Sequence, residues 1–156
     1  MSSKSVLYLR LELVWWLFTA LTTMLILYPI YTKLTGFPFY WMNGIFIVSS
    51  ITLIRYIFLL PYTFLARQQM LKVAIVFVTV PYVFYLVESV YVFNEYLDYD
   101  RLGAMVSGLP VEEQKGMLNY IRNEVLLFGV AAVISASAFP FRMIISVWRQ
   151  RNKVGI

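Results

Sequence analysis

Arg55 and Glu88 are ionisable residues that stand deep within long apolar stretches of the sequence. A charge near the middle of a bilayer costs about 2.5–3.5 kcal/mol on insertion scales, so such a side chain normally faces protein or water. Arg55 lies 12 residues before Arg67, and Glu88 lies 16 residues after Lys72. At ~1.5 Å per residue they stand about 18 and 24 Å from the same end of two antiparallel helices. A long Arg side chain can bridge this axial gap, so we predict an ion pair between Arg55 and Glu88.

Two roles are open to this pair. It can belong to a proton or ion path, because ionisable groups inside membranes often serve transport. It can also be a buried clamp that fixes the register of two helices or holds a partner subunit. The sequence contains no His and no second carboxylate at a similar depth. Because one pair does not make a relay, we favour the clamp.

Other chemistry finds little support in the residue types. The sequence has no Cys and no His, which excludes thiolate nucleophiles, haem ligation by His and the usual zinc and copper sites. It has no Gly-rich phosphate loop, no HExxH and no GxSxG, the patterns of common catalytic sites. The 12 Tyr and four Trp could line a quinone pocket, but these residues also gather at membrane interfaces. We therefore expect no catalytic residue, no metal, no cofactor and no enzymatic activity.

The elements that position these residues follow from composition. Of the residues, 61% are hydrophobic and 13% are charged, whereas a soluble domain carries about 25% charged residues. Four apolar runs, 11–31, 41–65, 73–94 and 124–147, each cover the ~20 residues that a helix needs to cross a bilayer. They lack the alternation of barrel strands. We predict an all-α integral membrane protein, a single domain over residues 1–156 with four transmembrane helices in an antiparallel bundle.

A longer connection, residues 95–123, separates the third run from the fourth. Apolar residues at helical spacing predict helix in its first half: Leu102, Met105, Val106 and Leu109. Pro110 followed by Glu112 and Glu113 resembles a helix start, with acids near the positive end of the dipole. A second stripe continues toward the fourth run: Val111, Leu118, Ile121 and Val125. We expect a helical hairpin here, the alternative being a loosely structured loop.

The basic residues are unequally divided between the two ends of the predicted bundle. One end carries Lys4, Arg10, Arg67, Lys72, Arg149, Arg151 and Lys153, and the other carries Lys33, Arg101, Lys115 and Arg122. The positive-inside rule then places both termini in the cytoplasm of a multi-pass protein of the cell inner (plasma) membrane, with the 95–123 hairpin outside. The net charge of +5 is thereby explained by sidedness, and we expect no nucleic-acid partner.

Arginines mark the end of the fourth run. Arg142 lies seven residues before Arg149, so its side chain can extend to the cytoplasmic interface. We assign Arg142 and Arg149 to that interface. Three prolines inside the runs can kink their helices, although membrane helices also tolerate proline: Pro61, Pro81 and Pro140.

Small residues in the fourth run permit close helix packing. Ala132 and Ala136 form a small-xxx-small pattern of the kind found where membrane helices approach closely. This helix–helix interface can lie inside the bundle or can receive a partner chain, and the pattern does not distinguish the two.

The sequence therefore favours a non-catalytic accessory or scaffolding subunit of a larger membrane protein complex. Its expected partners are membrane lipids and either other membrane subunits or further copies of itself. The alternative is a small oligomeric transporter or channel that uses Arg55 and Glu88. A membrane enzyme acting on a lipid or a quinone is a third hypothesis.

Overall fold

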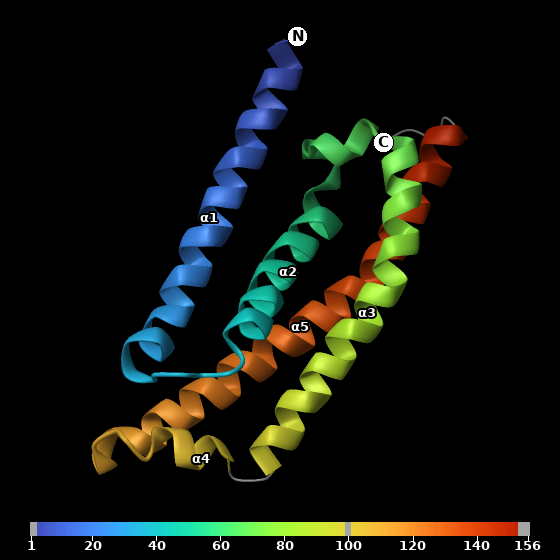
Figure 1. Cartoon of the computed structure of the whole chain (residues 1–156). Helices are drawn as coiled ribbons and strands as arrows, with labels where there is room; N and C mark the ends of the chain where they lie inside the picture. Colours follow the sequence, from blue (N-terminus) through green and yellow to red (C-terminus); the bar gives the residue numbers. More distant parts are fainter. Residues whose placement is uncertain (1–2, 99–100, 153–156) are drawn as a thin grey trace.

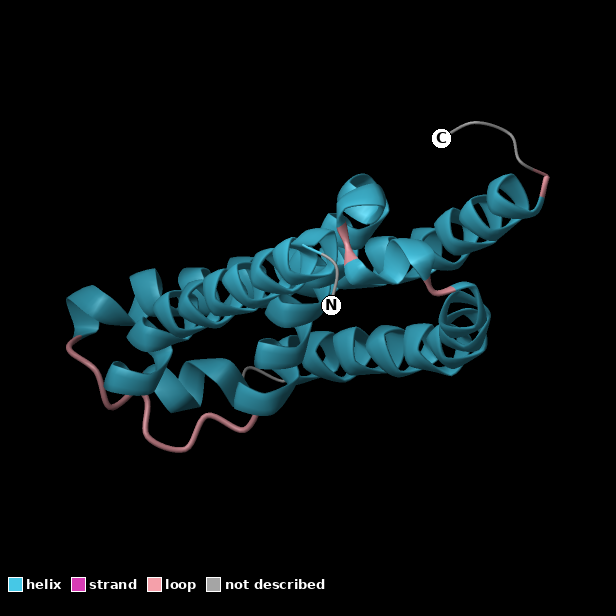
Figure 2. Ribbon diagram, turned by 90° about the horizontal axis from the view of Figure 1, so that it is seen from above, coloured by secondary structure: helices cyan, strands magenta, loops and turns pink. Residues whose placement is uncertain are grey.

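The computed structural model describes residues 3–98 and 101–152, which are helical throughout apart from short turns (Figure 1). The long helices are α1 (Ser3–Lys33), α2 (Tyr40–Leu59), α3 (Gln69–Asp98) and α5 (Val111–Arg151). Two short 3₁₀ helices, η1 (Leu60–Tyr62) and η2 (Phe64–Arg67), follow α2, and the short helix α4 (Arg101–Val106) precedes α5. Figure 2 shows the same chain turned by 90°, with short loops between the helices.

Four of these helices are long and apolar enough to cross a membrane: Val6–Lys33, Tyr40–Tyr62, Gln69–Leu97 and Val111–Arg151. The predicted runs 11–31, 73–94 and 124–147 lie wholly within α1, α3 and α5. Successive long helices run in opposite directions (Figure 1). The prediction of an all-helical chain with four helices of spanning length is therefore confirmed.

The second run does not form one continuous helix over residues 41–65 as predicted, and the effect of Pro61 is larger than the expected kink. The α-helix ends at Leu59, and the chain turns at Thr63, whose φ of −105° and ψ of 159° are those of extended backbone. Pro61 explains the break, because proline has no N–H to donate to the carbonyl of Ile57 one turn earlier. Arg55 consequently lies one turn from the end of α2 and not deep within a longer helix. Pro81 and Pro140, by contrast, lie inside continuous helices.

Helix α5 packs against both α2 and α3, while α1 packs against α2 and η2. The core between them contains large apolar side chains that are fully buried, including Phe46, Leu86, Phe93 and Ile121. Figure 1 shows one end of the bundle, hereafter the terminal end, where α1 begins, α5 ends and the η helices lie. The opposite end, hereafter the loop end, carries α4 and the turn between α1 and α2.

Small residues of α5 allow the helices to approach closely inside the chain. Ala132 and Ala136 have no exposed surface, so at these two positions the small side chains serve internal packing. A Cβ atom added at Gly129 would lie 2.9 Å from Val90 Cγ2 and 3.2 Å from Phe46 Cε2. The backbone of α5 thus contacts side chains of α2 and α3 directly.

The connection after α3 is helical, as predicted, but it is divided differently. Leu102 and Val106 of α4 are buried in the core. Helix α5 starts directly after Pro110, with Glu112 and Glu113 in its first turn, which confirms the predicted helix start. Val111 is 82% exposed, so its assignment to the apolar stripe was wrong. Residues 111–123 are the first turns of α5 and are continuous with the spanning segment. They are therefore not a separate second helix of the predicted 95–123 hairpin.

The turn between α1 and α2 contains Gly36 at a φ of +86°, a conformation that glycine adopts without steric cost. Near it, Lys33 at the end of α1 forms an ion pair of 2.6 Å with Glu113 at the start of α5. Both side chains are about half exposed. Such a pair contributes on the order of 0–1 kcal/mol, so it adds little to the stability of the loop end.

Candidate functional site: a buried ion pair and an exposed acid

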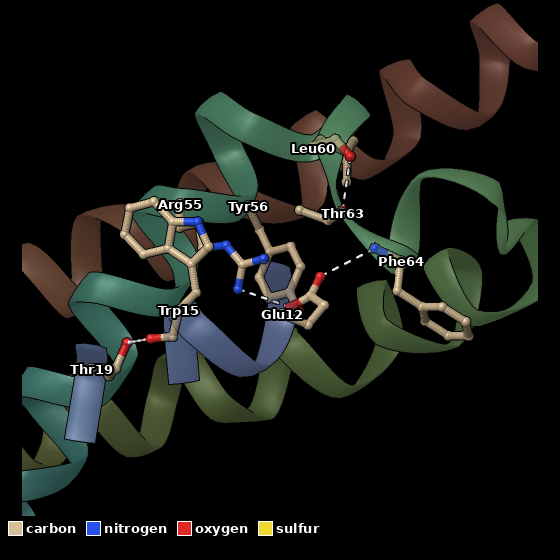
Figure 3. A network of polar contacts seen from close by, with 8 residues as sticks. All are labelled: Glu12, Trp15, Thr19, Arg55, Tyr56, Leu60, Thr63 and Phe64. Atoms are coloured by element: carbon tan, nitrogen blue, oxygen red, sulfur yellow. Dashed lines mark hydrogen bonds and ion pairs between the residues drawn. The ribbon is translucent and has the colours of Figure 1, made fainter. Parts of the chain in front are cut away.

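Arg55 pairs with Glu12 of α1 and not with Glu88 as predicted. Arg55 Nη1 lies 2.8 Å from Glu12 Oε2, and the two side chains are 6% and 10% exposed (Figure 3). The error follows from the break after Leu59, because a straight second helix would have placed Arg55 deeper. Glu12 stands near the start of α1, where the shortened α2 also ends. Pro61 was the sequence signal for the break, but it did not identify Glu12 as the partner.

Glu12 also receives two hydrogen bonds that join α1 to the break after α2. The backbone N–H of Phe64 donates to Glu12 Oε1 over 3.1 Å, and the Tyr56 hydroxyl donates to Oε2 over 3.4 Å (Figure 3). The first N–H groups of a helix have no partner within it, and a carboxylate satisfies such a donor well. Glu12 therefore caps η2 from a different helix.

Two aromatic rings complete the surroundings of Arg55. Its guanidinium carbon lies 5.4 Å from the ring centroid of Trp15 and 5.3 Å from that of Tyr56. At these distances the rings attract the cation. The cluster of Glu12, Trp15, Arg55 and Tyr56 joins α1 to α2 and η2, which gives it the geometry of a structural clamp.

Glu88 lies on an exposed face of α3. It forms no hydrogen bond or ion pair with any residue that the structure describes. The neighbours one turn away on the same face are aromatic: Phe84 is 71% exposed and Tyr91 is 66% exposed. Phe77 and Pro81 extend this exposed face at spacings of three and four residues. A carboxylate thus stands inside the apolar segment of α3 without a partner among the described residues.

A second buried polar pair links α2 to α5, and sequence reasoning missed it. Asn43 Nδ2 donates to Glu124 Oε2 over 2.7 Å, and the residues are 0% and 7% exposed. The remaining oxygens, Asn43 Oδ1 and Glu124 Oε1, are buried and have no hydrogen-bond partner. The predicted fourth run begins at Glu124, and Asn43, a polar residue within the second run, signalled that a buried partner was needed without identifying it.

The terminal end holds the arginines assigned to the cytoplasmic interface. Arg142 Nε donates to the carbonyl oxygen of Ile57 over 3.0 Å, the carbonyl that Pro61 leaves without a helical donor. The side chain of Arg142 is therefore held against α2. Arg149 is exposed.

Lys72 is fully buried at the same end. Its ammonium group donates to the carbonyl of Ala66 over 2.6 Å, to Ser146 Oγ over 2.9 Å and to Gln150 Oε1 over 3.2 Å. These three acceptors satisfy an ammonium group, which has three donors. Lys72 thereby joins η2 to the end of α5.

Together these features define an all-helical protein with four helices able to cross a membrane, a buried ion pair and an exposed acid on a spanning helix. Comparison of the chain with protein-family models, with curated proteins and with solved structures gives no match.

Proposed function

We propose that this chain is a non-catalytic accessory or scaffolding subunit of a larger membrane protein complex. The observation that carries the proposal is Glu88, an exposed carboxylate within the spanning segment of α3. Ionisable groups in membrane segments almost always face protein or water and pair with one another. Since Glu88 has no partner among the described residues, a second protein is the natural source of one.

The surroundings of Glu88 suit a protein partner. Phe84 and Tyr91 flank it by one turn on each side and are largely exposed. Aromatic residues are enriched in protein interfaces, and Tyr is among the residues that most often dominate their binding energy. We infer that this face of α3, defined by Phe77, Pro81, Phe84, Glu88 and Tyr91, is the docking surface.

Charge identifies the kind of partner. Two copies inserted in the same orientation and related by a two-fold axis would bring the same face together. Their Glu88 carboxylates would then meet, and like charges at close range disfavour ionisation of both. A helix of another membrane protein that carries Lys or Arg at this depth supplies the missing cation. We therefore propose a basic transmembrane helix as the partner.

The geometry favours the accessory role over the transporter alternative. That alternative takes Arg55 and Glu88 as one path, whereas Arg55 is bound to Glu12 and Glu88 lies on an exposed face. The scaffolding role needs only the exposed face and the clamp.

We also propose that both termini are cytoplasmic in the inner (plasma) membrane. The support is the gathering of Arg10, Lys72, Arg149 and Arg151 toward the terminal end, which the positive-inside rule assigns to the cytoplasm. The side chains of Lys4, Arg67 and Lys153, which belong to the same prediction, lie outside the described part of the structure.

The test is purification of the full chain in mild detergent from its native membrane, with mass spectrometry of the proteins recovered. We expect a stoichiometric partner with the unaltered chain and with the control E112Q, which removes an exposed acid from the start of α5. We expect at least ~10-fold less partner with E88Q, because loss of a buried pair exceeds the 1.4 kcal/mol that this factor represents.

Two outcomes would count against these proposals. A homogeneous homo-oligomer that conducts ions in liposomes would replace the accessory role with the transporter alternative. A stoichiometric partner that E88Q retains in full would keep the accessory role but reject the α3 docking surface.

A further inference from the structure

We infer that a cationic cavity at the terminal end binds the phosphate of an anionic lipid headgroup. The cavity has a volume of about 330 Å³, and its polar lining consists of Tyr8, Arg142, Ser146, Arg149 and Gln150. Leu60 and Pro61 supply an apolar wall. It thus combines two guanidinium groups with an apolar surface at the end of a helical bundle.

The break in α2 builds this cavity. Pro61 ends the helix, and η1 and η2 follow it in place of further turns of α2 (Figure 1). Leu60, Pro61 and Ala66 of this segment line the cavity together with residues of the last turns of α5. The freed carbonyl of Ile57 accepts a hydrogen bond from Arg142 Nε, which leaves the two terminal nitrogens of the guanidinium for a ligand. Arg142 is therefore oriented by the backbone before any ligand arrives.

Hydrogen bonds also hold Ser146 and Gln150, the polar lining residues of α5, in place. Gln150 Nε2 donates to the carbonyl of Ala66 over 2.7 Å. Lys72 contacts Ser146 and Gln150 from behind the lining and adds a further positive charge. The polar lining is thus held in place from both η2 and α3.

No described residue neutralises the positive charge of the cavity. No acid is among the described residues that line it, and neither Arg142 nor Arg149 forms an ion pair with the described part of the chain. The acid near η2, Glu12, is already bound to Arg55. Guanidinium groups bind phosphate through paired, charge-assisted hydrogen bonds, so the fitting ligand is a phosphate oxyanion.

Position and lining favour a lipid as the source of that phosphate. The cavity lies at the end of the spanning helices, the level of the headgroups, and basic pockets between membrane helices are known to bind acidic lipids. A zwitterionic lipid would bring an ammonium group for which the lining offers no acid. The apolar wall can accept the start of an acyl chain, which inorganic phosphate lacks. A phosphatidylglycerol-like lipid therefore fits best.

The test measures lipid retention by native mass spectrometry and thermal unfolding of the full chain in detergent. Phosphatidylglycerol, phosphatidylcholine and inorganic phosphate are the three additives. We expect phosphatidylglycerol alone to remain bound and to raise the unfolding temperature. The variant R149E should lower its affinity about tenfold or more, since it places a carboxylate where a guanidinium meets phosphate. Arg149 forms no hydrogen bond or ion pair with the described chain, so this variant keeps the fold.

The matched control is R151E, which makes the same charge change two residues later. Arg151 lies at the same end of α5 but outside the lining of this cavity, and R151E should keep the affinity. Equal losses in both variants would show general surface attraction and overturn the site. Equal binding of phosphatidylcholine would overturn the anionic headgroup, and equal stabilisation by inorganic phosphate would overturn the lipid as its source.

Discussion

Replacing Glu12 with Gln should strongly destabilise the packing of α1 on α2. The substitution keeps the size of the side chain but leaves the Arg55 guanidinium, only 6% exposed, without its counter-ion. Breaking a buried pair by removing one partner costs about 3–5 kcal/mol. Gln also replaces one carboxylate oxygen with an NH2 group, which cannot accept a hydrogen bond. Arg55 Nη1 and the Phe64 N–H use different oxygens of Glu12, so one of them would face a donor. We therefore expect the free energy of unfolding to fall by about 3 kcal/mol or more.

The assay is unfolding by a denaturing detergent, followed by tryptophan fluorescence. Trp15 is a built-in reporter, because its ring lies 5.4 Å from the Arg55 guanidinium carbon. The variants are E12Q, R55M and the double variant. Since each single variant strands a buried group and the double variant strands none, the double variant should lose much less than the sum of the two, with a coupling of about 2 kcal/mol.

Additive losses below about 1 kcal/mol for each single variant would refute the buried clamp, since that size is typical of an exposed pair. Exchange of the two residues, E12R with R55E, should rescue only in part. Arginine has no acceptor for the Phe64 N–H that Glu12 Oε1 receives in the native chain. Full rescue would show that the cap on η2 contributes nothing.

Three further stability predictions use the same unfolding assay. Replacing Gly129 with Ala should cost about 1–3 kcal/mol by overpacking, because the added Cβ would lie 2.9 Å from a neighbouring side chain. The control Gly44→Ala should be neutral or stabilising, because its Cβ would lie 4.0 Å from the nearest atom. Equal effects of the two variants would contradict the close approach at Gly129. Replacing Glu124 with Gln should preserve stability or raise it, since an amide can donate to the unpaired oxygen of Asn43 while accepting its N–H. The variant Asn43→Ala should instead cost about 1–3 kcal/mol. A large loss of stability in E124Q would show that the carboxylate must be ionised. Replacing Lys72 with Met should cost roughly 2 kcal/mol through three lost hydrogen bonds, and unchanged unfolding would show that they contribute no net stability.

The sequence predicted the helices better than their ends. Apolar runs of spanning length are a strong signal, because in lipid a helix satisfies its own backbone groups. The start of α5 at Pro110 was also readable, since the proline and the acids after it occur together at helix starts. Pro61 was the difficult case: Pro81 and Pro140 stay inside continuous helices, so a proline alone does not tell a kink from an end.

The partners of the buried polar residues could not be predicted from spacing. The depth of Arg55 along an assumed continuous helix suggested Glu88 as its partner. Pairing also depends, however, on which sides of the helices contact each other. Helix α1 packs on α2 and η2, and this brings Glu12 within 2.8 Å of Arg55. The direction in which Glu88 points is likewise a property of tertiary packing, because α3 uses its other face to contact α5. The buried pair of Asn43 and Glu124 joins residues 81 positions apart, a separation that no local pattern reports.

The most direct test of the central claim is photo-crosslinking in the native membrane from Phe84, one turn from Glu88 on the exposed face of α3. A photoreactive amino acid there should give one discrete adduct with a transmembrane helix of another protein that contains Lys or Arg. The same label at Leu25, which is equally exposed on α1, should not give that adduct. Adducts from Phe84 with lipid alone, or with a second copy of this chain, would contradict the proposal that Glu88 docks a basic helix of a partner subunit.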